Sequence, residues 1–149
     1  MHVLVPTLGH STRFTYAANG LDSLSLATLS CRLKTTENSI KAPLVIVTSN
    51  AFEAQRLLEE LPYFSPDLSV HLLPDWETLP YDVFSPHPDL ISERLATLYQ
   101  ISQNQCDVVI VPIATALLRL PPVSYFAGHT FMLKKAQKLD LDEIGRAHV

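Results

Sequence analysis

Glycine, cysteine and tryptophan are all scarce in this chain of 149 residues, which has four glycines, two cysteines and one tryptophan. No glycine precedes a lysine, and the glycines lie far apart, at positions 9, 20, 128 and 145. Neither of the common phosphate-binding motifs, G-x-x-x-x-G-K-[ST] and G-x-G-x-x-G, can therefore be written anywhere in the sequence. Without backbone N–H groups and a lysine to hold a triphosphate, we expect no ATP hydrolysis by this chain.

Other kinds of site are missing as well. Cys31 and Cys106 belong to no C-x-x-C pair, and neither H-E-x-x-H nor G-x-S-x-G occurs, so metal, redox and nucleophilic catalysis have no support. No secretory signal opens the sequence, and no apolar run reaches the roughly 18 residues of a membrane-spanning helix. We therefore expect a cytoplasmic location and no membrane partner.

The charge of the chain argues against tight, independent binding to duplex DNA. The formal net charge is −4, whereas such binding needs a broad basic surface. The small cluster of Lys134, Lys135 and Lys138 is interpreted as a solvated surface. An apolar content of 47% is sufficient for a packed core, so we expect one domain, or one domain and the start of another.

Apolar periodicity predicts strands that alternate with helices. The expected strands are 43–49, 68–73, 107–112 and 130–133, and the first and third are apolar throughout, as in strands buried on both faces. Helices are expected over 21–33, 50–62, 89–103 and 113–120. The second should begin with a capping box between Asn50 and Glu53 and end at Pro62, and the third should have Asp89 as its N-cap. Residues 140–143 read as the start of another helix. This order is typical of a parallel sheet covered by helices on both faces.

Three of these helices have an expected inner face. For the helix that begins at Asn50 it comprises Ala51, Ala54, Leu58 and Leu61. For helix 21–33 it comprises Leu21, Leu24, Ala27 and Cys31. For helix 89–103 it comprises Leu90, Ile91, Leu95, Leu98 and Tyr99.

A loop stiffened by proline joins the second strand to the third helix. Prolines at 74, 80, 86 and 88 exclude a central strand or a helix interior. Long loops of this kind are often functional. The candidate residues for interdomain or structural contacts are Asp75, Trp76, Glu77, Tyr81, Asp82, Phe84 and His87.

Simpler interpretations of these residues remain open. The aromatic side chains could close one end of a core. The carboxylates could cap turns rather than act as paired acids and bases, and His87 could cap the following helix rather than transfer protons.

The same loop carries a family resemblance. Residues 75–89 follow the pattern D-W-E-T-L-P-Y-D-x-F-S-P-H-x-D, and residues 91–99 follow I-S-x-R-L-x-T-L-Y. Both patterns resemble the N-terminal region of the bacterial transcription-repair coupling factors (Mfd). The resemblance extends over residues 20–143 and includes the strand 108–112, the Gly128-His129 pair and the lysine-rich run 134–139.

The resemblance implies an α/β fold: a degenerate helicase-like domain of the RecA/P-loop type, similar to UvrB and incomplete at its C-terminus. Residues 1–19 would form a poorly defined arm, 20–127 the UvrB-like domain, and 128–142 the start of a UvrA-docking domain. Residues 143–149 match the translation of a sequencing adaptor, so we expect a non-native tail; a divergent native C-terminus is the alternative. The degenerate nucleotide loop would comprise Asn19, Gly20, Asp22 and Ser23.

The resemblance also implies a function. A complete coupling factor would displace stalled RNA polymerase, recruit UvrA for nucleotide excision repair, and hold ATP, Mg²⁺ and DNA in a separate motor domain. This portion would be a scaffold that contacts other domains, with no catalytic, cofactor-binding or metal-binding residue and no UvrA-contact residue of its own. The alternative is an active ATP-dependent helicase or a UvrB-type damage-binding subunit. The loop is too short for the DNA-binding hairpin of UvrB.

Overall fold

A computed structural model describes residues 9–13, 20–35, 42–78, 83 and 85–129. The chain divides into two compact units, Met1–Leu118 and Arg119–Val149. The strand expected at 130–133, the helix start at 140–143, the N-terminal arm up to residue 8 and the tail at 143–149 lie outside the described residues. The assignment of 128–142 to a docking domain stays a prediction.

The first unit is built on a parallel sheet of three strands, β1 (Leu44–Thr48), β2 (Val70–Leu72) and β3 (Val108–Pro112). The strand order is β1-β3-β2, so β3 is central. Both outer strands align with β3, and Val45 and His71 flank Val109. This arrangement confirms the predicted α/β class with a parallel sheet.

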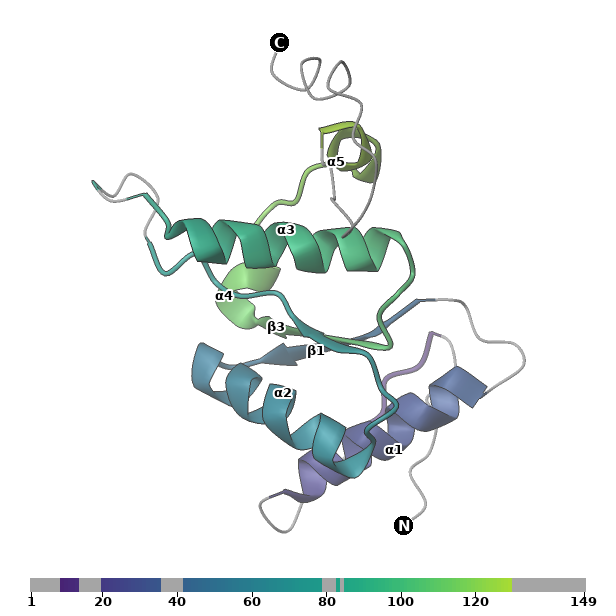
Figure 1. Cartoon of the computed structure of the whole chain (residues 1–149). Coiled ribbons are helices and arrows are strands. Elements are labelled where there is room, and N and C mark those ends of the chain that lie inside the picture. The colour runs from purple at the N-terminus through teal and green to yellow at the C-terminus, as the bar shows by residue number, and fades with distance from the viewer. Residues whose placement is uncertain (1–8, 14–19, 36–41, 79–82, 84, 130–149) are drawn as a thin grey trace. The chain divides into compact units, whose positions relative to one another are not determined.

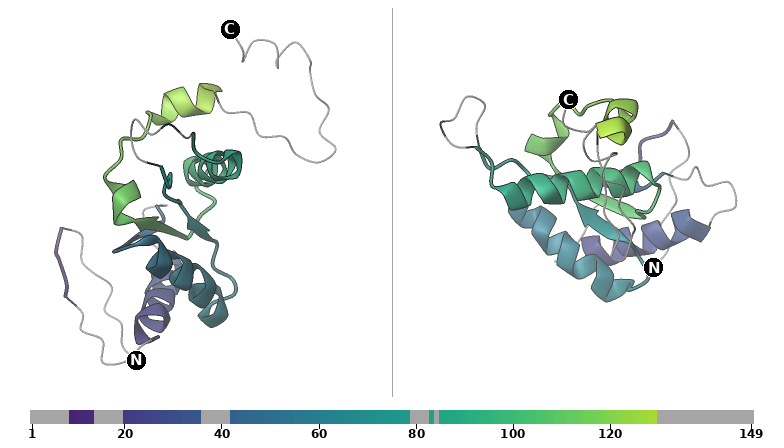
Figure 2. Two further views of the ribbon diagram at one scale, coloured as in Figure 1. Left: turned by 90° about the vertical axis from the view of Figure 1, so that its left-hand side faces the viewer. Right: turned by 45° about the horizontal axis from the view of Figure 1, so that its top comes forward.

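Helices lie on the two faces of this sheet (Figures 1 and 2). On one face, α1 (Leu21–Thr35) and α2 (Ala51–Phe64) pack over a core that includes Ile46, Val108 and Ile110. On the other face, α3 (Pro88–Ser102) covers Val109 and Val111. All five residues of β3 are buried, as its continuous apolar run predicts.

Coverage of β1 is less complete than its sequence suggests. Val45 and Val47 are 57% and 52% exposed, so the prediction that this strand is buried on both faces was wrong. Four of its five residues are apolar, but among the described residues the one that belongs to the core under α1 and α2 is Ile46. Within the described part of the chain, α3 covers β3 rather than β1.

The inner face of α1 also differs from the prediction. Ala27 is buried as expected, but Leu24 is 39% exposed. Its buried positions include three serines, Ser23, Ser25 and Ser30. Short hydroxyl side chains can face inward because two of them donate to carbonyl oxygens one turn earlier, Ser25 to Leu21 and Ser30 to Leu26.

Three predicted helix boundaries were inaccurate. Helix α2 passes through Pro62 to Phe64, because a proline in the last turn removes a single hydrogen bond. Helix α3 begins at Pro88, with His87 rather than Asp89 as N-cap. The last helix of the first unit, α4, spans only Ile113–Ala116.

The capping box of α2 is present as predicted on the Asn50 side. The Asn50 side chain accepts a hydrogen bond from the Glu53 N–H at 2.9 Å. In the second unit the described element is α5, Val123–His129, which the sequence did not suggest. Within the described residues, no helix has the length and hydropathy required to span a bilayer.

Candidate functional site

The loop after β2 starts at the carboxyl edge of the sheet, where parallel α/β folds usually place their sites. Leu73 is 4% exposed, and its N–H donates to the Ile110 carbonyl at 2.9 Å. Pro74 is buried, and Asp75 and Trp76 are partly buried. The backbone of the first part of the loop is therefore held firmly against β3.

A buried arginine from α3 fixes this part of the loop. Arg94 is only 3% exposed, and its guanidinium lies 4.2 Å from the centre of the Trp76 ring. Its Nη1 also donates a hydrogen bond to the Pro74 carbonyl. A cation over an indole face is attracted by the ring quadrupole, and more strongly when both groups are partly removed from water.

The electrostatics of Arg94 are those of a buried cation. Burial lowers the pKa of the guanidinium, and the nearby negative charge of Asp75 partly opposes that shift. Within the described part of the chain, Asp75 forms no direct ion pair with Arg94, since its carboxylate is used locally. One oxygen, Oδ1, accepts from the Trp76 N–H at 2.9 Å and from the Thr115 hydroxyl at 3.3 Å.

Asp75 therefore links two segments that leave the carboxyl edge. It belongs to the loop after β2, and Thr115, which is 2% exposed, belongs to α4 directly after β3. Arg94 adds the third segment, α3. We refer to Asp75, Trp76, Arg94 and Thr115 as the loop anchor.

The loop anchor includes two of the seven residues that the sequence proposed for this loop. Glu77 follows it, exposed and with a φ of 58°, an uncommon conformation for a residue other than glycine. Tyr81, Asp82 and Phe84 lie outside the described residues. His87 caps α3: its Nδ1 accepts from the Asp89 N–H at 3.3 Å.

Sequence reasoning missed Arg94 and Thr115. The expected inner face of α3 contained leucines, isoleucine and tyrosine, but Ile91 and Leu95 are 37% and 40% exposed. The buried positions of α3 are Arg94 and Thr97. The sequence did contain a signal for Arg94, because an arginine is part of the family pattern I-S-x-R-L at residues 91–95. Helical periodicity alone, however, does not predict that this arginine faces inward.

The residues that the sequence proposed for a degenerate nucleotide loop lie at and before the head of α1. Asn19 lies outside the described residues, and Gly20 has a φ of 82° and provides the carbonyl that accepts from the Leu24 N–H at 3.2 Å. Asp22, in the first turn of α1, accepts a hydrogen bond from Arg56 at 2.6 Å. A carboxylate and an arginine thus meet at the N-terminus of α1, the end of a helix that can attract an anion.

Arg56 forms a charged cluster between α1 and α2. Its guanidinium contacts Glu53 at 2.8 Å and Glu60 at 2.7 Å as well as Asp22. Ser23 lies in the same cluster, donating to Glu60 and accepting from Arg56 at 3.2 Å. The hydrogen bond from Arg56 is the main cause of the lowered pKa of Asp22, and the acidic partners in turn raise the pKa of Arg56.

A second ion pair joins α1 to the sheet. Lys34 lies 2.8 Å from the Asp107 carboxylate, which also accepts from the Ser69 N–H at 2.9 Å. Burial on its own would raise the pKa of Asp107, but these two hydrogen bonds outweigh it, and the pKa is lowered.

These two aspartates predict that stability falls in acid. The pKa values of Asp22 and Asp107 in the folded chain lie below their ordinary value of 3.8. Below that value the unfolded chain therefore binds more protons, so both contributions are present at neutral pH and are lost as pH falls through the lowered pKa values. Urea denaturation from about pH 6 to about pH 3 should show this decline.

The matched variants Asp22→Asn and Asp107→Asn test the origin of that decline. Each should be less stable than the parent chain at neutral pH and should show a shallower dependence of stability on pH. Gln55→Ala, at an exposed and uncharged position, serves as the control and should retain the slope of the parent. Unchanged slopes in both test variants would contradict the assignment.

Metal and thiol chemistry gain no support from the geometry. No group of three or more His, Cys, Asp or Glu side chains among the described residues is placed to hold a metal ion. Cys31 and Cys106 are both unbridged, and burial raises the pKa of the Cys106 thiol. Both side chains pack in or against the hydrophobic core.

The parallel sheet flanked by helices defines the class of protein: an α/β domain consistent with a degenerate RecA-like, UvrB-like domain. Curated relatives identify the family. The chain is 45% identical over 114 residues to the transcription-repair coupling factor of Escherichia coli, 39% identical over 100 residues to that of Haemophilus influenzae, and 34% identical over 107 residues to that of Rickettsia bellii. The chain belongs to the transcription-repair coupling factor family.

The matched part is a small share of those relatives. It covers 72%, 67% and 71% of this chain, but only 10%, 9% and 10% of the three relatives respectively. No protein-family model matches the chain.

Proposed function

We propose that this chain is a non-catalytic scaffold portion of a transcription-repair coupling factor. The complete protein would use ATP to displace stalled RNA polymerase and would recruit UvrA to begin nucleotide excision repair in the cytoplasm. ATP, Mg²⁺ and DNA would bind to a motor domain elsewhere in the polypeptide. The part described here would support neighbouring domains through the loop that the anchor holds.

The observation that carries this proposal is the charge arrangement at the head of α1. A nucleotide-binding domain of this class needs glycine N–H groups and a lysine there, so that an anion is attracted. In this chain the Asp22 carboxylate lies in the first turn, paired with Arg56 at 2.6 Å. A triphosphate would meet a like charge and would compete with an ion pair already formed.

The loop anchor supports the scaffold role. A half-buried tryptophan, a buried arginine and a carboxylate hold the start of the loop. The hydroxyl paired with that carboxylate, from Thr115, is 2% exposed, and among the described residues no second carboxylate is paired with them as an acid or base. Such an arrangement fixes the direction in which the chain leaves the sheet. It is suited to presenting a loop to another domain.

Nucleotide titration separates this proposal from the alternative of an active helicase or a UvrB-type DNA-binding subunit. Isothermal calorimetry of the 149-residue chain with a non-hydrolysable ATP analogue and Mg²⁺, and fluorescence anisotropy with single-stranded DNA, should show no saturable binding at moderate salt. An active P-loop ATPase is the positive control for the nucleotide. Micromolar affinity for the ATP analogue would favour the alternative.

A matched variant sharpens the nucleotide test. Asp22→Asn removes the like charge at the head of α1 but restores neither the glycines nor the lysine, so it should remain without nucleotide affinity. Binding gained in this variant would mean that a single carboxylate, rather than a missing phosphate cradle, blocks the site.

A further inference from the structure

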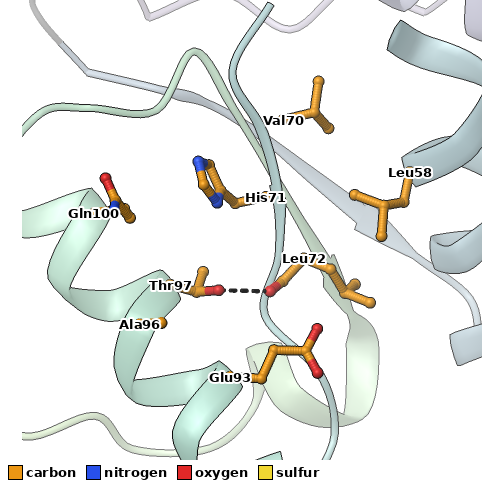
Figure 3. Close-up of a pocket in the computed structure, with 8 residues that line it drawn as sticks. All are labelled: Leu58, Val70, His71, Leu72, Glu93, Ala96, Thr97 and Gln100. Atoms are coloured by element: carbon orange, nitrogen blue, oxygen red, sulfur yellow. Dashed lines mark hydrogen bonds between the residues drawn. The ribbon is translucent and has the colours of Figure 1, made fainter. Parts of the chain in front are cut away.

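A groove lies beside β2, lined by residues of β2, α2 and α3 (Figure 3). Among the strands that the structure describes, β2 is an outer one and pairs only with β3. The groove has a volume of about 310 Å³ and lies between α2 and α3. Its lining residues are Leu58, Val70, His71, Leu72, Glu93, Ala96, Thr97 and Gln100.

The backbone of β2 directs hydrogen-bonding groups into this groove. The Ser69 carbonyl accepts from the Val108 N–H, and the Leu73 N–H donates to the Ile110 carbonyl, so residues 69 and 73 face β3. Alternate residues of a strand direct their N–H and C=O groups to opposite edges. Residue 71, between residues 69 and 73, therefore also faces β3. Val70 directs both of its backbone groups, the N–H and the C=O, away from β3.

Thr97 reduces the number of backbone groups of β2 that remain available to a partner strand. Its hydroxyl donates to the Leu72 carbonyl at 2.9 Å, as Figure 3 shows, so that acceptor is already used. The groups left facing the groove are the N–H and C=O of Val70 and the N–H of Leu72. They can bind a short added strand, but not a long one.

The two walls of the groove differ in chemistry. The α2 side is apolar, with Leu58, Val70 and Leu72 packed against the core. The α3 side is polar and carries Glu93 and Gln100. Glu93 is exposed, and it forms no ion pair with any residue that the structure describes.

We propose that this edge binds an extended segment of a partner protein in which apolar and basic residues alternate. The segment adds to the sheet beside β2 through the backbone of Val70. Its apolar side chains lie on the wall formed by Leu58, and a lysine or arginine lies opposite Glu93, because alternate side chains of a strand point to opposite faces. This interaction goes beyond the scaffold role and does not depend on it.

A synthetic peptide of alternating valine and lysine, labelled with fluorescein, is the probe. Anisotropy titration with the 149-residue chain should give saturable binding. A peptide of alternating valine and glutamate is the control and should bind at least about tenfold more weakly, since its carboxylates meet Glu93. Equal binding of both peptides, or no saturable binding of the lysine peptide, would overturn the proposal.

Val70→Pro tests whether the backbone of β2 takes part. Proline removes the N–H that faces the groove, and it is tolerated on an edge strand because the hydrogen bonds to β3 come from other residues. Binding should weaken about tenfold, the cost of one backbone hydrogen bond, while the far-UV circular dichroism stays that of the parent. The variant keeps every charge of the parent chain. If it binds the peptide as well as the parent does, the binding is electrostatic adsorption without strand addition, and the proposal is overturned.

Two further variants keep the test decisive if Val70→Pro disturbs the fold. Ala96→Phe places a large side chain in the groove from α3 and should abolish binding. Glu93→Gln should weaken it about threefold, as expected for one exposed ion pair. Full binding by Ala96→Phe would place the peptide elsewhere on the chain.

Sedimentation equilibrium distinguishes a partner segment from a second copy of the chain. We expect the sedimentation of the chain to be unaffected by Val70→Pro. Concentration-dependent dimerisation that this substitution removes would mean that the edge pairs with itself, and it would overturn the assignment to a partner.

Discussion

Replacing Ile110 by alanine should lower the free energy of unfolding by about 4 kcal/mol, within the range measured for large-to-small changes at fully buried sites. Ile110 is 0% exposed, lies in the middle of the central strand, and packs in the core beneath α1 and α2. The substitution removes apolar contacts and leaves a cavity that neighbours on both sides of β3 cannot fill without moving the sheet. Domains of this kind are stable by only about 5–15 kcal/mol, so the variant should be close to unfolding.

Urea denaturation followed by far-UV circular dichroism measures this loss. Val45→Ala is the matched control, because Val45 lies on the neighbouring strand but is 57% exposed. Its substitution should cost well under about 1 kcal/mol, as is usual for surface positions. Similar losses in the two variants would mean that β1 and β3 are equally covered in solution, contrary to the structure.

The contrast between these strands shows what hydrophobic patterning can and cannot predict. Both β1 and β3 have continuous apolar runs, and the sequence predicts two buried faces for each. For β3 this is confirmed. For β1 it was wrong on the Val45 and Val47 face, because burial of a strand depends on which helix crosses it, and that is decided by tertiary arrangement rather than by the strand itself.

The helices show a complementary difficulty. Period and composition placed α1, α2 and α3 correctly in the chain, and Ala54 and Leu61 of α2 are buried as predicted, but the inward sides of α1 and α3 were misjudged. Serines of α1 and Arg94 and Thr97 of α3 are buried, since each finds a hydrogen-bond acceptor there. A hydropathy pattern treats such residues as solvent-facing, because it cannot show that a carbonyl oxygen lies within reach.

The sequence predicted only part of the candidate site, because it does not show which distant residues become hydrogen-bond partners. Proline and aromatic content drew attention to the loop, and Asp75 and Trp76 are held in the loop anchor as structural residues. Their partners come from α3 and α4. Arg94 lies 18 residues after Trp76 in the sequence, and Thr115 lies 40 residues after Asp75. Contacts across such separations are not visible in local patterns, so the sequence could propose the loop but not what holds it.

Replacing Arg94 by alanine should cost about 3 kcal/mol, because a hydrogen bond from a charged group contributes about 1.5–3 kcal/mol and a partly desolvated cation–π contact up to about 2 kcal/mol. The substitution removes the cation over Trp76 and leaves the buried Pro74 carbonyl without the donor that Arg94 provides. Because Trp76 is the only tryptophan in the chain, its fluorescence reports on the loop anchor directly. In the folded variant the emission should shift to longer wavelength as the ring becomes more exposed to water.

The choice of replacement separates the contributions of charge and shape. Arg94→Lys keeps the charge, but it lacks the planar guanidinium that lies on the indole, so it should recover only part of the stability. Leu95→Ala, at the adjacent and 40% exposed position, is the control; it should cost about 1 kcal/mol or less and leave the emission unchanged. If Arg94→Ala is as mild as Leu95→Ala and shows no spectral shift, then Arg94 does not hold the loop, and the inward side of α3 is the apolar one that its sequence predicts.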